Sequence, residues 1–297
     1  MDNLLTVFAA VAEKKSFSRA AEELHLTQPG VSLQIQALEK EYGTKLLERT
    51  NKSVRLTKAG EILYFHAKQI MHEYDQAKRR IDDLVHTASG RLGIGASYTF
   101  GEYILPYVVS SFRLKYPDIV PAITIENTHQ VADQIMRREL DVGIVEGELE
   151  HPNLVVRPFA PDAMVIIVPA GHRWTSWTQI DPKELETEPW IVREPGSGTR
   201  EVANHLFSDL GFQPKSMMEF GSTQVVKEAV EAGLGIALIS ERAITKERIL
   251  GTLHPLTITG HPVIRHFSWV THRAQFHTKA LDLFIEFLGA RMQQFLP

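Results

Sequence analysis

Two short amphipathic segments separated by a tight break constrain the fold of this 297-residue chain more than any other feature. Residues 16–24 (SFSRAAEEL) offer a serine N-cap at Ser16 or Ser18 and then place alanines and a leucine on one face. Residues 27–43 (TQPGVSLQIQALEKEYG) begin at Thr27, carry Pro29 in the first turn and repeat apolar residues at helical spacing. With a further helix predicted over residues 2–14, this pattern is typical of a helix-turn-helix.

A hairpin wing is predicted next. Residues 45–60 (KLLERTNKSVRLTKAG) contain two β-prone runs around Asn51. Between Arg19 and Lys40 there is no Lys or Arg, so the second helix of the motif carries almost no positive charge. Residues 49–60 of the wing instead concentrate basic residues without an acidic one, and we expect them to meet the phosphates of a nucleic acid: Arg49, Lys52, Arg55 and Lys58.

A long helix is predicted from about residue 57 to residue 88, because no Gly or Pro follows Gly60 in that stretch. Its apolar residues recur in two heptad series, which is the a/d pattern of a dimerising coiled coil. The alternative is a long surface helix packed along its own domain, which gives a weaker form of the same pattern. The two series are Leu63, Ile70, Ala77 and Leu84, and Ala67, Tyr74, Ile81 and Ala88.

From Arg91 onward, strands and helices alternate, which predicts parallel βαβ units in two α/β lobes with a cleft between them. The first lobe is expected to use strands near residues 91–97, 121–127 and 141–147, with helices near 101–115 and 130–139. The second set comprises strands near 163–169, 189–195, 217–221 and 235–240, with helices near 199–210 and 223–232. A helix over residues 275–295 is expected to close the fold.

Composition excludes several classes of protein. The chain is 43% hydrophobic and 23% charged, as is ordinary for globular domains. It has no cysteine, which rules out disulfides and thiolate metal sites. No apolar run approaches the ~20 residues needed to span a bilayer, so we expect a cytoplasmic protein without a membrane role. The net charge of −4 is unevenly distributed, since residues 1–89 carry 13 basic and 12 acidic residues.

No catalytic motif is present. The sequence lacks G-x-S-x-G, H-E-x-x-H and a Walker loop, and the GIG at residues 93–95 is not followed by the rest of a dinucleotide fingerprint. The 13 histidines have no metal-ligand spacing, and we interpret His266, His272 and His277 as surface or interlobe residues. We therefore expect no enzyme activity, no cofactor and no metal site.

The stretch FSRAAEELHLTQPGVSLQIQALEKEYGTKLLERT, followed by VRLTKAG, resembles the amino-terminal domain of LysR-type transcriptional regulators. The resemblance is specific over residues 1–60 and architectural beyond them. It implies a winged helix-turn-helix domain (1–58), a linker and dimerisation helix (59–89), and a two-lobed α/β effector-binding domain similar to periplasmic binding proteins (90–297). Lobe I would comprise about 90–161 and 269–297, and lobe II about 162–268.

The resemblance also implies which residues contact DNA. Short polar side chains at the head of the second helix would read base edges, and the wing would bind phosphates. Thr27 and Pro29 are also good helix-start residues in any protein. Leu33 stands where many relatives have a basic residue, which increases the dependence on the wing. The implied contacts are Thr27, Gln28, Pro29, Ser32, Gln34, Arg49, Lys52 and Arg55.

Effector candidates lie where predicted strands end and helices begin. EPGSGTR, residues 194–200, has the composition of an anion-binding turn, although Gly-Ser-Gly is also an ordinary turn and Ser and Thr are ordinary N-caps. Glu146 complicates an anion site, because it could select an amine or hydroxyl of the ligand or pair with Arg200. The candidates are Ser97, Tyr98, Thr99, Thr128, Glu146, Ser197, Gly198, Thr199, Arg200 and Thr223.

Taken with the resemblance, these features predict a regulator that binds promoter DNA as a dimer or tetramer and is switched by a small anionic metabolite. RNA polymerase is a further partner that the family suggests. The GSGTR turn is similar to regulators of sulfur assimilation and of carbon fixation. The alternative is a cytoplasmic small-molecule receptor or α/β enzyme without a DNA role, but it would leave the first 90 residues unexplained.

Overall fold

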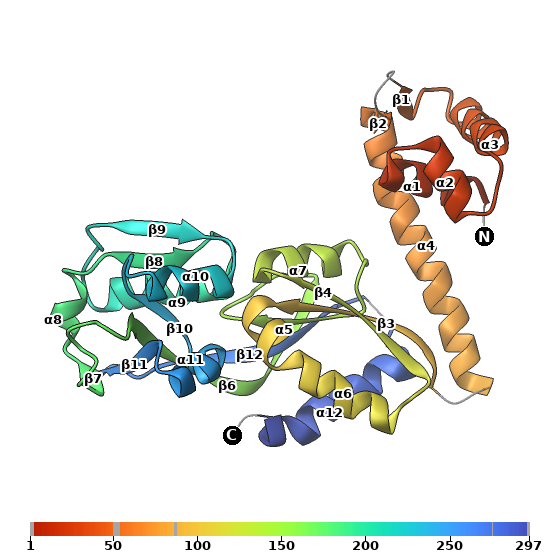
Figure 1. Cartoon of the computed structure of the whole chain (residues 1–297). Helices are drawn as coiled ribbons and strands as arrows, with labels where there is room; N and C mark the ends of the chain where they lie inside the picture. Colours follow the sequence, from red (N-terminus) through yellow and green to blue (C-terminus); the bar gives the residue numbers. More distant parts are fainter. Residues whose placement is uncertain (1–2, 50–53, 86–87, 275, 296–297) are drawn as a thin grey trace. The chain divides into compact units, whose positions relative to one another are not determined.

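A computed structural model describes residues 3–49, 54–85, 88–274 and 276–295. The chain forms two compact units, which divide in sequence after residue 86. Each has its own apolar core, and Figure 1 labels the elements of both. In the described part of the chain, no helix is both long and apolar enough to cross a membrane.

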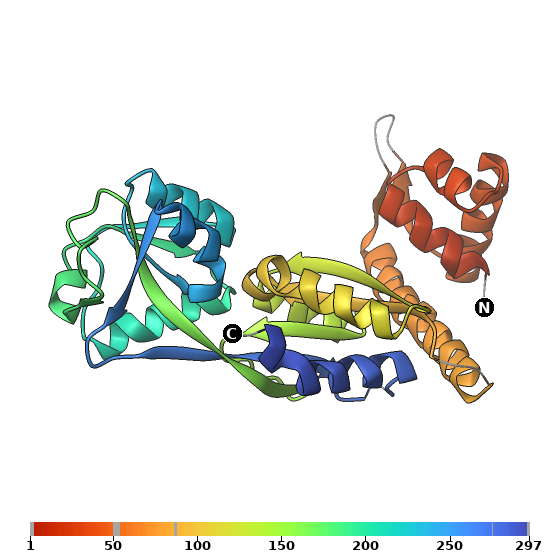
Figure 2. The ribbon, with the colours of Figure 1, turned by 60° about the horizontal axis from the view of Figure 1, so that its bottom comes forward.

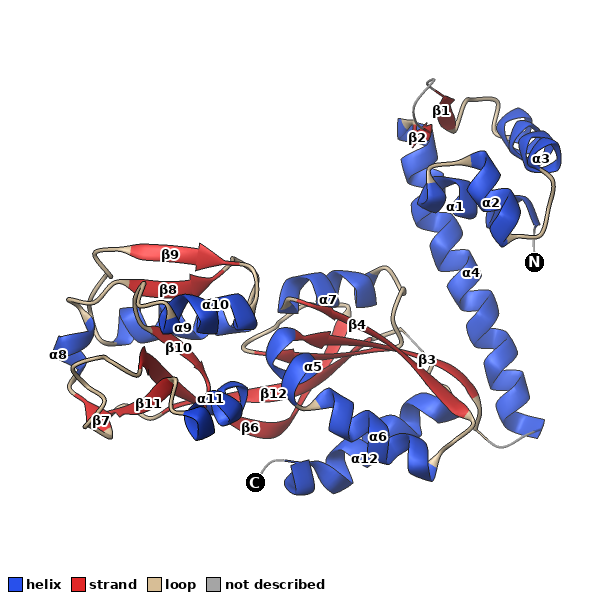
Figure 3. Cartoon of the chain, in the orientation of Figure 1, coloured by secondary structure: helices blue, strands red, loops and turns tan. Residues whose placement is uncertain are grey.

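The amino-terminal unit is a winged helix-turn-helix with one long helix, as Figure 3 shows by the grouping of its helices and its short strands. Phe8, Val11, Val31, Ile35 and Leu38 are almost fully buried in its core, so the predicted apolar stripes do face inward. Its elements are α1 (Asn3–Lys14), α2 (Phe17–Glu23), α3 (Gln28–Glu41), the antiparallel pair β1 (Leu47–Arg49) and β2 (Val54–Leu56), and α4 (Lys58–Val85).

Helix α4 satisfies only part of the predicted heptad pattern. Leu63 and Ala67 are buried in the core of their own unit, so at these two positions the intramolecular alternative is correct. Farther along, Ile70 and Tyr74 are each 50% exposed and Ile81 is 62% exposed. The helix ends at Val85, which places Ala88 beyond it. The apolar stripe therefore continues past the domain core onto an exposed helix face.

Lobe I of the carboxyl-terminal unit contains the predicted parallel strands. They are β3 (Gly90–Ser97), β4 (Ile119–Glu126) and β5 (Val142–Glu146), in the sheet order β4-β3-β5. One face of this sheet is covered by the helices α5 (Tyr98–Tyr103), α6 (Leu105–Lys115) and α12 (Lys279–Phe295), and the other by α7 (Thr128–Met136). Figure 2 shows α6 and α12 lying side by side.

Lobe II has a sheet with apolar cores on both faces. Its parallel pair β8 (Trp190–Arg193) and β9 (Met217–Phe220) joins β10 through a bridge between Trp190 and Ile236. The other elements are β7 (Gln179–Ile180), α8 (Pro182–Leu185), α9 (Gly198–Asp209), α10 (Thr223–Glu231), β10 (Ala237–Ser240), the 3-10 helix η1 (Glu241–Ile244), α11 (Thr245–Leu250) and β11 (Leu253–Ile258).

Two long strands connect the lobes. β6 (Leu154–Pro169) and β12 (Val263–His272) pair with each other in antiparallel fashion, as Figure 2 shows. They lie in the middle of one eight-stranded sheet, in which β12 pairs with β5 of lobe I and β6 pairs with β10 and β11 of lobe II. The sequence predicted only residues 163–169 of β6, and neither β11 nor β12. The predicted fold class of a helix-turn-helix followed by a two-lobed α/β domain is confirmed.

Candidate functional site: recognition helix and interlobe cluster

The head of α3 presents short polar side chains. Thr27 caps the helix, with its Oγ1 accepting a hydrogen bond from the Gly30 amide at 3.2 Å. Thr27, Gln28 and Pro29 are exposed, and Gln28 Nε2 donates to Ser32 Oγ at 3.0 Å. Gln34 differs, because its side-chain oxygen is buried. Of the residues predicted to contact DNA from α3, Thr27, Gln28 and Pro29 are therefore exposed at the start of the helix, whereas the side-chain oxygen of Gln34 is not.

Glu39 fastens the far end of α3 to the base of the wing. Its carboxylate accepts hydrogen bonds from the amides of Leu46 (3.1 Å) and Leu47 (3.4 Å) and from Lys45 Nζ (2.6 Å). Burial alone would raise the pKa of Glu39, but the hydrogen bonds from Lys45 and the two amides outweigh it and hold the pKa below its usual value. The ionised carboxylate thus positions α3 relative to β1.

Two of the four basic residues predicted in the wing, Arg55 and Lys58, have described and exposed side chains. Arg55 is exposed on β2, opposite Glu48 in the β1–β2 ladder. Lys58, at the start of α4, forms an ion pair with Glu61 at 2.7 Å. The predicted contact Lys52 and the side chain of Arg49 lie outside the described residues.

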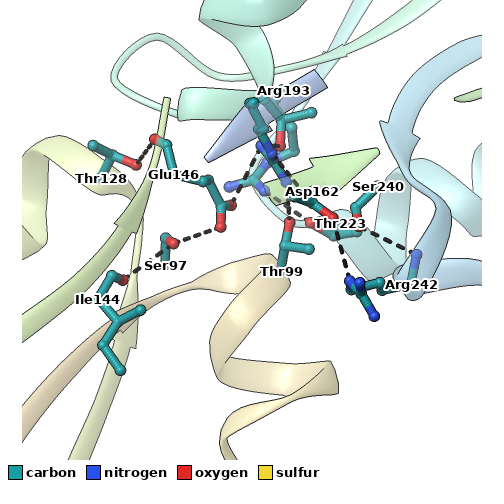
Figure 4. Close-up of polar contacts among 12 residues, drawn as sticks. Ser97, Thr99, Thr128, Ile144, Glu146, Asp162, Arg193, Thr223, Ser240 and Arg242 are labelled. Carbon is teal, nitrogen blue, oxygen red and sulfur yellow. Dashed lines mark hydrogen bonds and ion pairs between the residues drawn. The ribbon is translucent and has the colours of Figure 1, made fainter. Parts of the chain in front are cut away.

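Between the lobes, Arg265 is the centre of a buried polar cluster. Figure 4 labels several of its members, among them Thr99, Glu146 and Asp162. Its Nε donates to Asp162 Oδ2 at 2.8 Å, from the strand position directly opposite in the β6–β12 ladder. Its Nη1 donates to Thr199 Oγ1 (2.9 Å) at the start of α9 in lobe II, and its Nη2 to Thr99 Oγ1 (3.0 Å) in α5 of lobe I. One guanidinium group therefore binds both lobes.

Glu146, at the carboxyl end of β5, is the second charge of this cluster. It is 1% exposed, its Oε2 accepts from Ser97 Oγ at 2.7 Å, and its Oε1 lies 3.7 Å from Arg265 Nη1 (Figure 4). Thr128 Oγ1 donates to its backbone carbonyl at 3.0 Å. Ser97, Thr99, Thr128, Glu146 and Thr199, all predicted from the sequence, thus lie together.

A second buried arginine lies beside this cluster. Arg193, at the end of β8, donates twice to Glu194 (2.7 and 2.8 Å) and once to Thr223 Oγ1 (3.0 Å). Its guanidinium stacks 4.6 Å from the centre of the Tyr98 ring, which belongs to lobe I. Burial would raise the pKa of Glu194, but Arg193 outweighs it and holds that pKa below its usual value. Tyr98 and Thr223 therefore meet at this arginine.

The composition of the EPGSGTR turn predicts an anion-binding turn, but in the structure the turn brings the start of α9 into contact with β5. Ser197 is buried but makes no side-chain cap hydrogen bond. A Cβ on Gly198 would lie only 1.9 Å from the carbonyl oxygen of Glu146, so glycine permits direct contact between α9 and β5. Arg200 does not pair with Glu146, because it forms its ion pair with Glu219 (3.2 Å) and donates to the Arg193 carbonyl.

The residues on which the cluster depends most are not among those predicted from the sequence. Arg265 and Asp162 lie on long strands that the sequence does not predict at these positions. Arg193 lies in a predicted strand but is not a predicted effector residue. The one available signal was an arginine within the otherwise strand-like stretch VIRHFSWV. Their partners are remote in sequence, so local patterns could not identify them.

A cavity of about 770 Å³ borders the cluster. Gly147, Arg265 and the α9 residues Glu201 and His205 line it, together with the acidic residues Glu148, Glu150 and Asp209. Burial is the main reason that the pKa of Glu201 is raised, while His129 and His205 lower it in part. Among the described residues, no group of His, Asp or Glu has the arrangement of a metal site.

Two protein-family models match the chain. The model described as "Bacterial regulatory helix-turn-helix protein, lysR family" matches residues 3–61, and the model "LysR substrate binding domain" matches residues 86–293. The first model falls within the amino-terminal unit, and the second spans most of the carboxyl-terminal unit.

Curated relatives match over nearly their whole length. The HTH-type transcriptional regulator CysL of Bacillus subtilis is 38% identical over 291 residues, covering 98% of this chain and 97% of CysL. The RuBisCO operon transcriptional regulator of Acidithiobacillus ferrooxidans is 34% identical over 286 residues, covering 96% and 92%. These relatives are transcriptional regulators and not enzymes.

Among solved structures, the CcmR regulatory domain from Synechocystis in complex with 2-PG superposes with a TM-score of 0.64 and 27% identity. The match covers 68% of this chain and 97% of that domain.

Proposed function

The chain belongs to the LysR family of bacterial regulatory helix-turn-helix proteins, and on that premise we propose how it binds DNA and which ligand switches it. It is a DNA-binding transcriptional regulator with an effector-binding domain. In our proposal, the head of α3 reads base edges, the wing binds phosphates, and a small anionic metabolite binds between the lobes. Its regulated genes would belong to sulfur assimilation or carbon fixation, as the names of its relatives suggest.

In the proposed DNA interface, α3 recognises bases and the wing binds phosphates. Gln28 and Ser32 offer amide and hydroxyl groups to base edges, and Thr27 and Pro29 complete the surface at the helix start. Leu33 is 65% exposed on α3, so this face offers an apolar side chain where a cation would otherwise reach the phosphate backbone. Arg55, with Arg49 and Lys52, would supply the positive charge. Gln34 is a weaker candidate because its oxygen is buried.

Self-association would multiply these contacts. The exposed face of α4 with Ile70, Tyr74 and Ile81 is the surface we assign to a partner helix, forming a dimer or tetramer. A two-fold dimer would bind an inverted repeat with two recognition helices. RNA polymerase would be a further partner at the promoter, and the cytoplasm the site of action.

The observation that carries the effector proposal is Arg265, a buried guanidinium bonded to hydroxyl groups of both lobes. A positive charge with hydroxyl groups around it is suited to bind an anion, and an anion there would change the contacts between the lobes. The similar CcmR domain was solved with 2-PG. Ser97, Thr99, Thr128, Glu146 and Thr199 would line the site, with Tyr98, Ser197, Gly198, Arg200 and Thr223 at its border.

A two-part experiment tests this proposal on the full chain. Selection of bound duplexes from fragmented genomic DNA should enrich inverted repeats upstream of a small set of genes. A thermal-shift screen against sulfur and carbon metabolites should then identify a ligand that changes DNA binding. Thr199→Val should abolish that thermal shift, whereas Thr187→Val, at an exposed threonine outside the cluster, should leave it intact.

Two results would contradict the proposal. Enrichment without any sequence preference would refute specific recognition by α3. A ligand whose thermal shift survives Thr199→Val unchanged would move the effector site away from the interlobe cluster.

A further inference from the structure

Glu146 is a negative charge held inside the site that should receive an anion. Its carboxylate is 1% exposed and accepts from Ser97 Oγ at 2.7 Å. It lies 3.7 Å from Arg265 Nη1, the same nitrogen that donates to Thr199. Hydroxyl and guanidinium donors are the groups that bind an anionic ligand. In this structure those donors already hold a carboxylate of the protein itself.

Arg265 has two carboxylate neighbours, and they are not equivalent. Asp162 is its cross-strand partner in the β6–β12 ladder, binds it at 2.8 Å and is also bonded to Ser240 at 2.6 Å. Glu146 comes from β5 of lobe I and lies at the longer distance of 3.7 Å. The Asp162 pair is therefore fixed by the backbone, whereas Glu146 is the carboxylate that can separate from Arg265.

A further anion cannot simply be added to this arrangement. A third negative charge beside Arg265 in a buried place would be unfavourable, because like charges at short range repel where water cannot screen them. Arg242 offsets the charge of Asp162, since its Nε lies 3.7 Å from Asp162 Oδ1, whereas Glu146 has Arg265 as its cationic neighbour. The cavity of about 770 Å³ is lined by Gly147, next to Glu146 in sequence, and by Arg265. The cavity therefore reaches the immediate neighbourhood of the cluster, and it is the route by which we expect a ligand to approach Glu146.

We infer that the Glu146 carboxylate is an internal competitor of the effector, which binds by displacing Glu146 from Ser97 and Arg265. The inference rests on the proposed function and deepens it in two respects. Before the effector arrives, Glu146 helps to hold the lobes together through Arg265. After displacement, the effector takes over these donors, so the exchange of one anion for another is the switching event.

The competitor also selects the chemical class of effector. A carboxylate tethered within the site has a high effective concentration, so a ligand with one similar carboxylate gains little by replacing it. A phosphate ester or sulfate carries up to two negative charges and more acceptor oxygens. The structure thus favours a doubly charged phosphoryl or sulfate anion over a monocarboxylate, and Glu146 is a specificity-determining residue.

Isothermal titration of the full chain with inorganic phosphate, sulfate and acetate tests this inference. The variants are Glu146→Gln, which keeps the shape and removes the charge, and Glu146→Ala, which serves as the second variant if the glutamine variant does not fold. We expect each folded variant to bind phosphate and sulfate at least about tenfold more tightly, since the site is no longer self-occupied. Acetate, without measurable binding to the wild type, should now bind.

Glu186→Gln is the matched control. It removes one carboxylate from an exposed position of the same unit, so it changes net charge equally without touching the cluster or its border. Its anion affinities should equal those of the wild type.

Three outcomes would overturn the inference. If the Glu146 variants bind phosphate and sulfate no more tightly than the wild type, Glu146 is not a competitor, although the anionic effector stands. An equal gain in Glu186→Gln would show that net charge alone is responsible. If neither the wild type nor any folded variant binds the three anions, the anionic-effector proposal falls together with this inference.

Discussion

Glu39 illustrates how one buried carboxylate can fix the geometry of a DNA-binding surface. It lies in α3, two turns beyond the residues proposed to read bases, and its oxygens hold the chain at Lys45, Leu46 and Leu47. Because its hydrogen bonds require the ionised form, the position of the wing depends on a charge that acid removes.

Replacing Glu39 with Gln should therefore destabilise the amino-terminal unit in a pH-dependent way. The pKa of Glu39 is depressed in the folded protein, so its contribution is fully present above the ordinary value of 4.5 and is lost as pH falls through the folded pKa. We expect a loss of about 1.5–3 kcal/mol at neutral pH, typical of hydrogen bonds to a charged group. Urea unfolding followed by circular dichroism measures it.

The exposed Glu41, in the same helix, supplies the control, and Glu41→Gln should change stability little. If the loss of unfolding free energy in Glu39→Gln stays constant down to strongly acidic pH, the depressed pKa of Glu39 is not the cause of that loss.

Replacing Gln28 with Ala and replacing Arg55 with Ala should change DNA affinity in different ways. Gln28→Ala should weaken binding to the preferred DNA sequence by about 1–3 kcal/mol and leave binding to unrelated DNA nearly unchanged. Arg55→Ala should weaken binding to all sequences alike and reduce the slope of log affinity against log salt by about 1. Fluorescence anisotropy with specific and scrambled duplexes at several salt concentrations separates the two. Equal losses on both duplexes for both variants would disprove this division.

The sequence alone predicts the structural roles of some residues and not the partners of others. Thr27 was placed correctly because capping depends on the next three residues. Glu146 was predicted in the cleft, but its partner Arg265 lies 119 positions away and could not be found from local patterns. Buried charges pair through tertiary contacts, and those depend on strand register, which a single sequence specifies weakly.

At the scale of elements, prolines explain two of the strands that were missed, β6 and β11, but not β12, which contains no proline. β6 contains Pro158 and Pro161, and β11 contains Pro255, so these runs lacked a strand signature. In the structure, Pro158 lies at a register shift between β6 and β12, where an irregular ladder tolerates a missing donor. Helices were predicted better, since their apolar spacing and caps are local features.

The exposed stripe of α4 should control self-association. Ile70→Lys is expected to weaken the dimer by roughly 3 kcal/mol, since two copies of a large apolar side chain would leave the interface, which corresponds to about a hundredfold in affinity. Sedimentation velocity over a concentration series measures the change. Ile62→Lys, on the same helix but off the stripe and 64% exposed, is the control and should not alter assembly. Equal effects of both changes would exclude the stripe as the interface.

At the scale of the whole molecule, the two units should unfold separately because each has its own core. All four tryptophans, at positions 174, 177, 190 and 269, belong to the carboxyl-terminal unit, so tryptophan fluorescence reports that unit alone. An effector at a hundred times its dissociation constant should stabilise that unit by about 2.7 kcal/mol and leave the other unchanged.

Calorimetry with parallel fluorescence tests this expectation. Two calorimetric transitions should appear, and the ligand should shift only the one that coincides with the fluorescence change. A single transition seen by both probes, moving as a whole with ligand, would contradict it.

The long strands β6 and β12 have a consequence for the newly made chain. Lobe I pairs β5 with β12, yet β12 is synthesised more than a hundred residues after β5, and all of lobe II lies between them. At about 5–20 residues per second, the edge of β5 waits roughly 6–23 s for its neighbour on the ribosome. The lobe II strands β7 to β11 are all synthesised before β12, so lobe II can fold first although it follows most of lobe I in the chain. A ribosome stalled before residue 263 would carry lobe I with an open sheet edge, the form most exposed to chaperones and to aggregation.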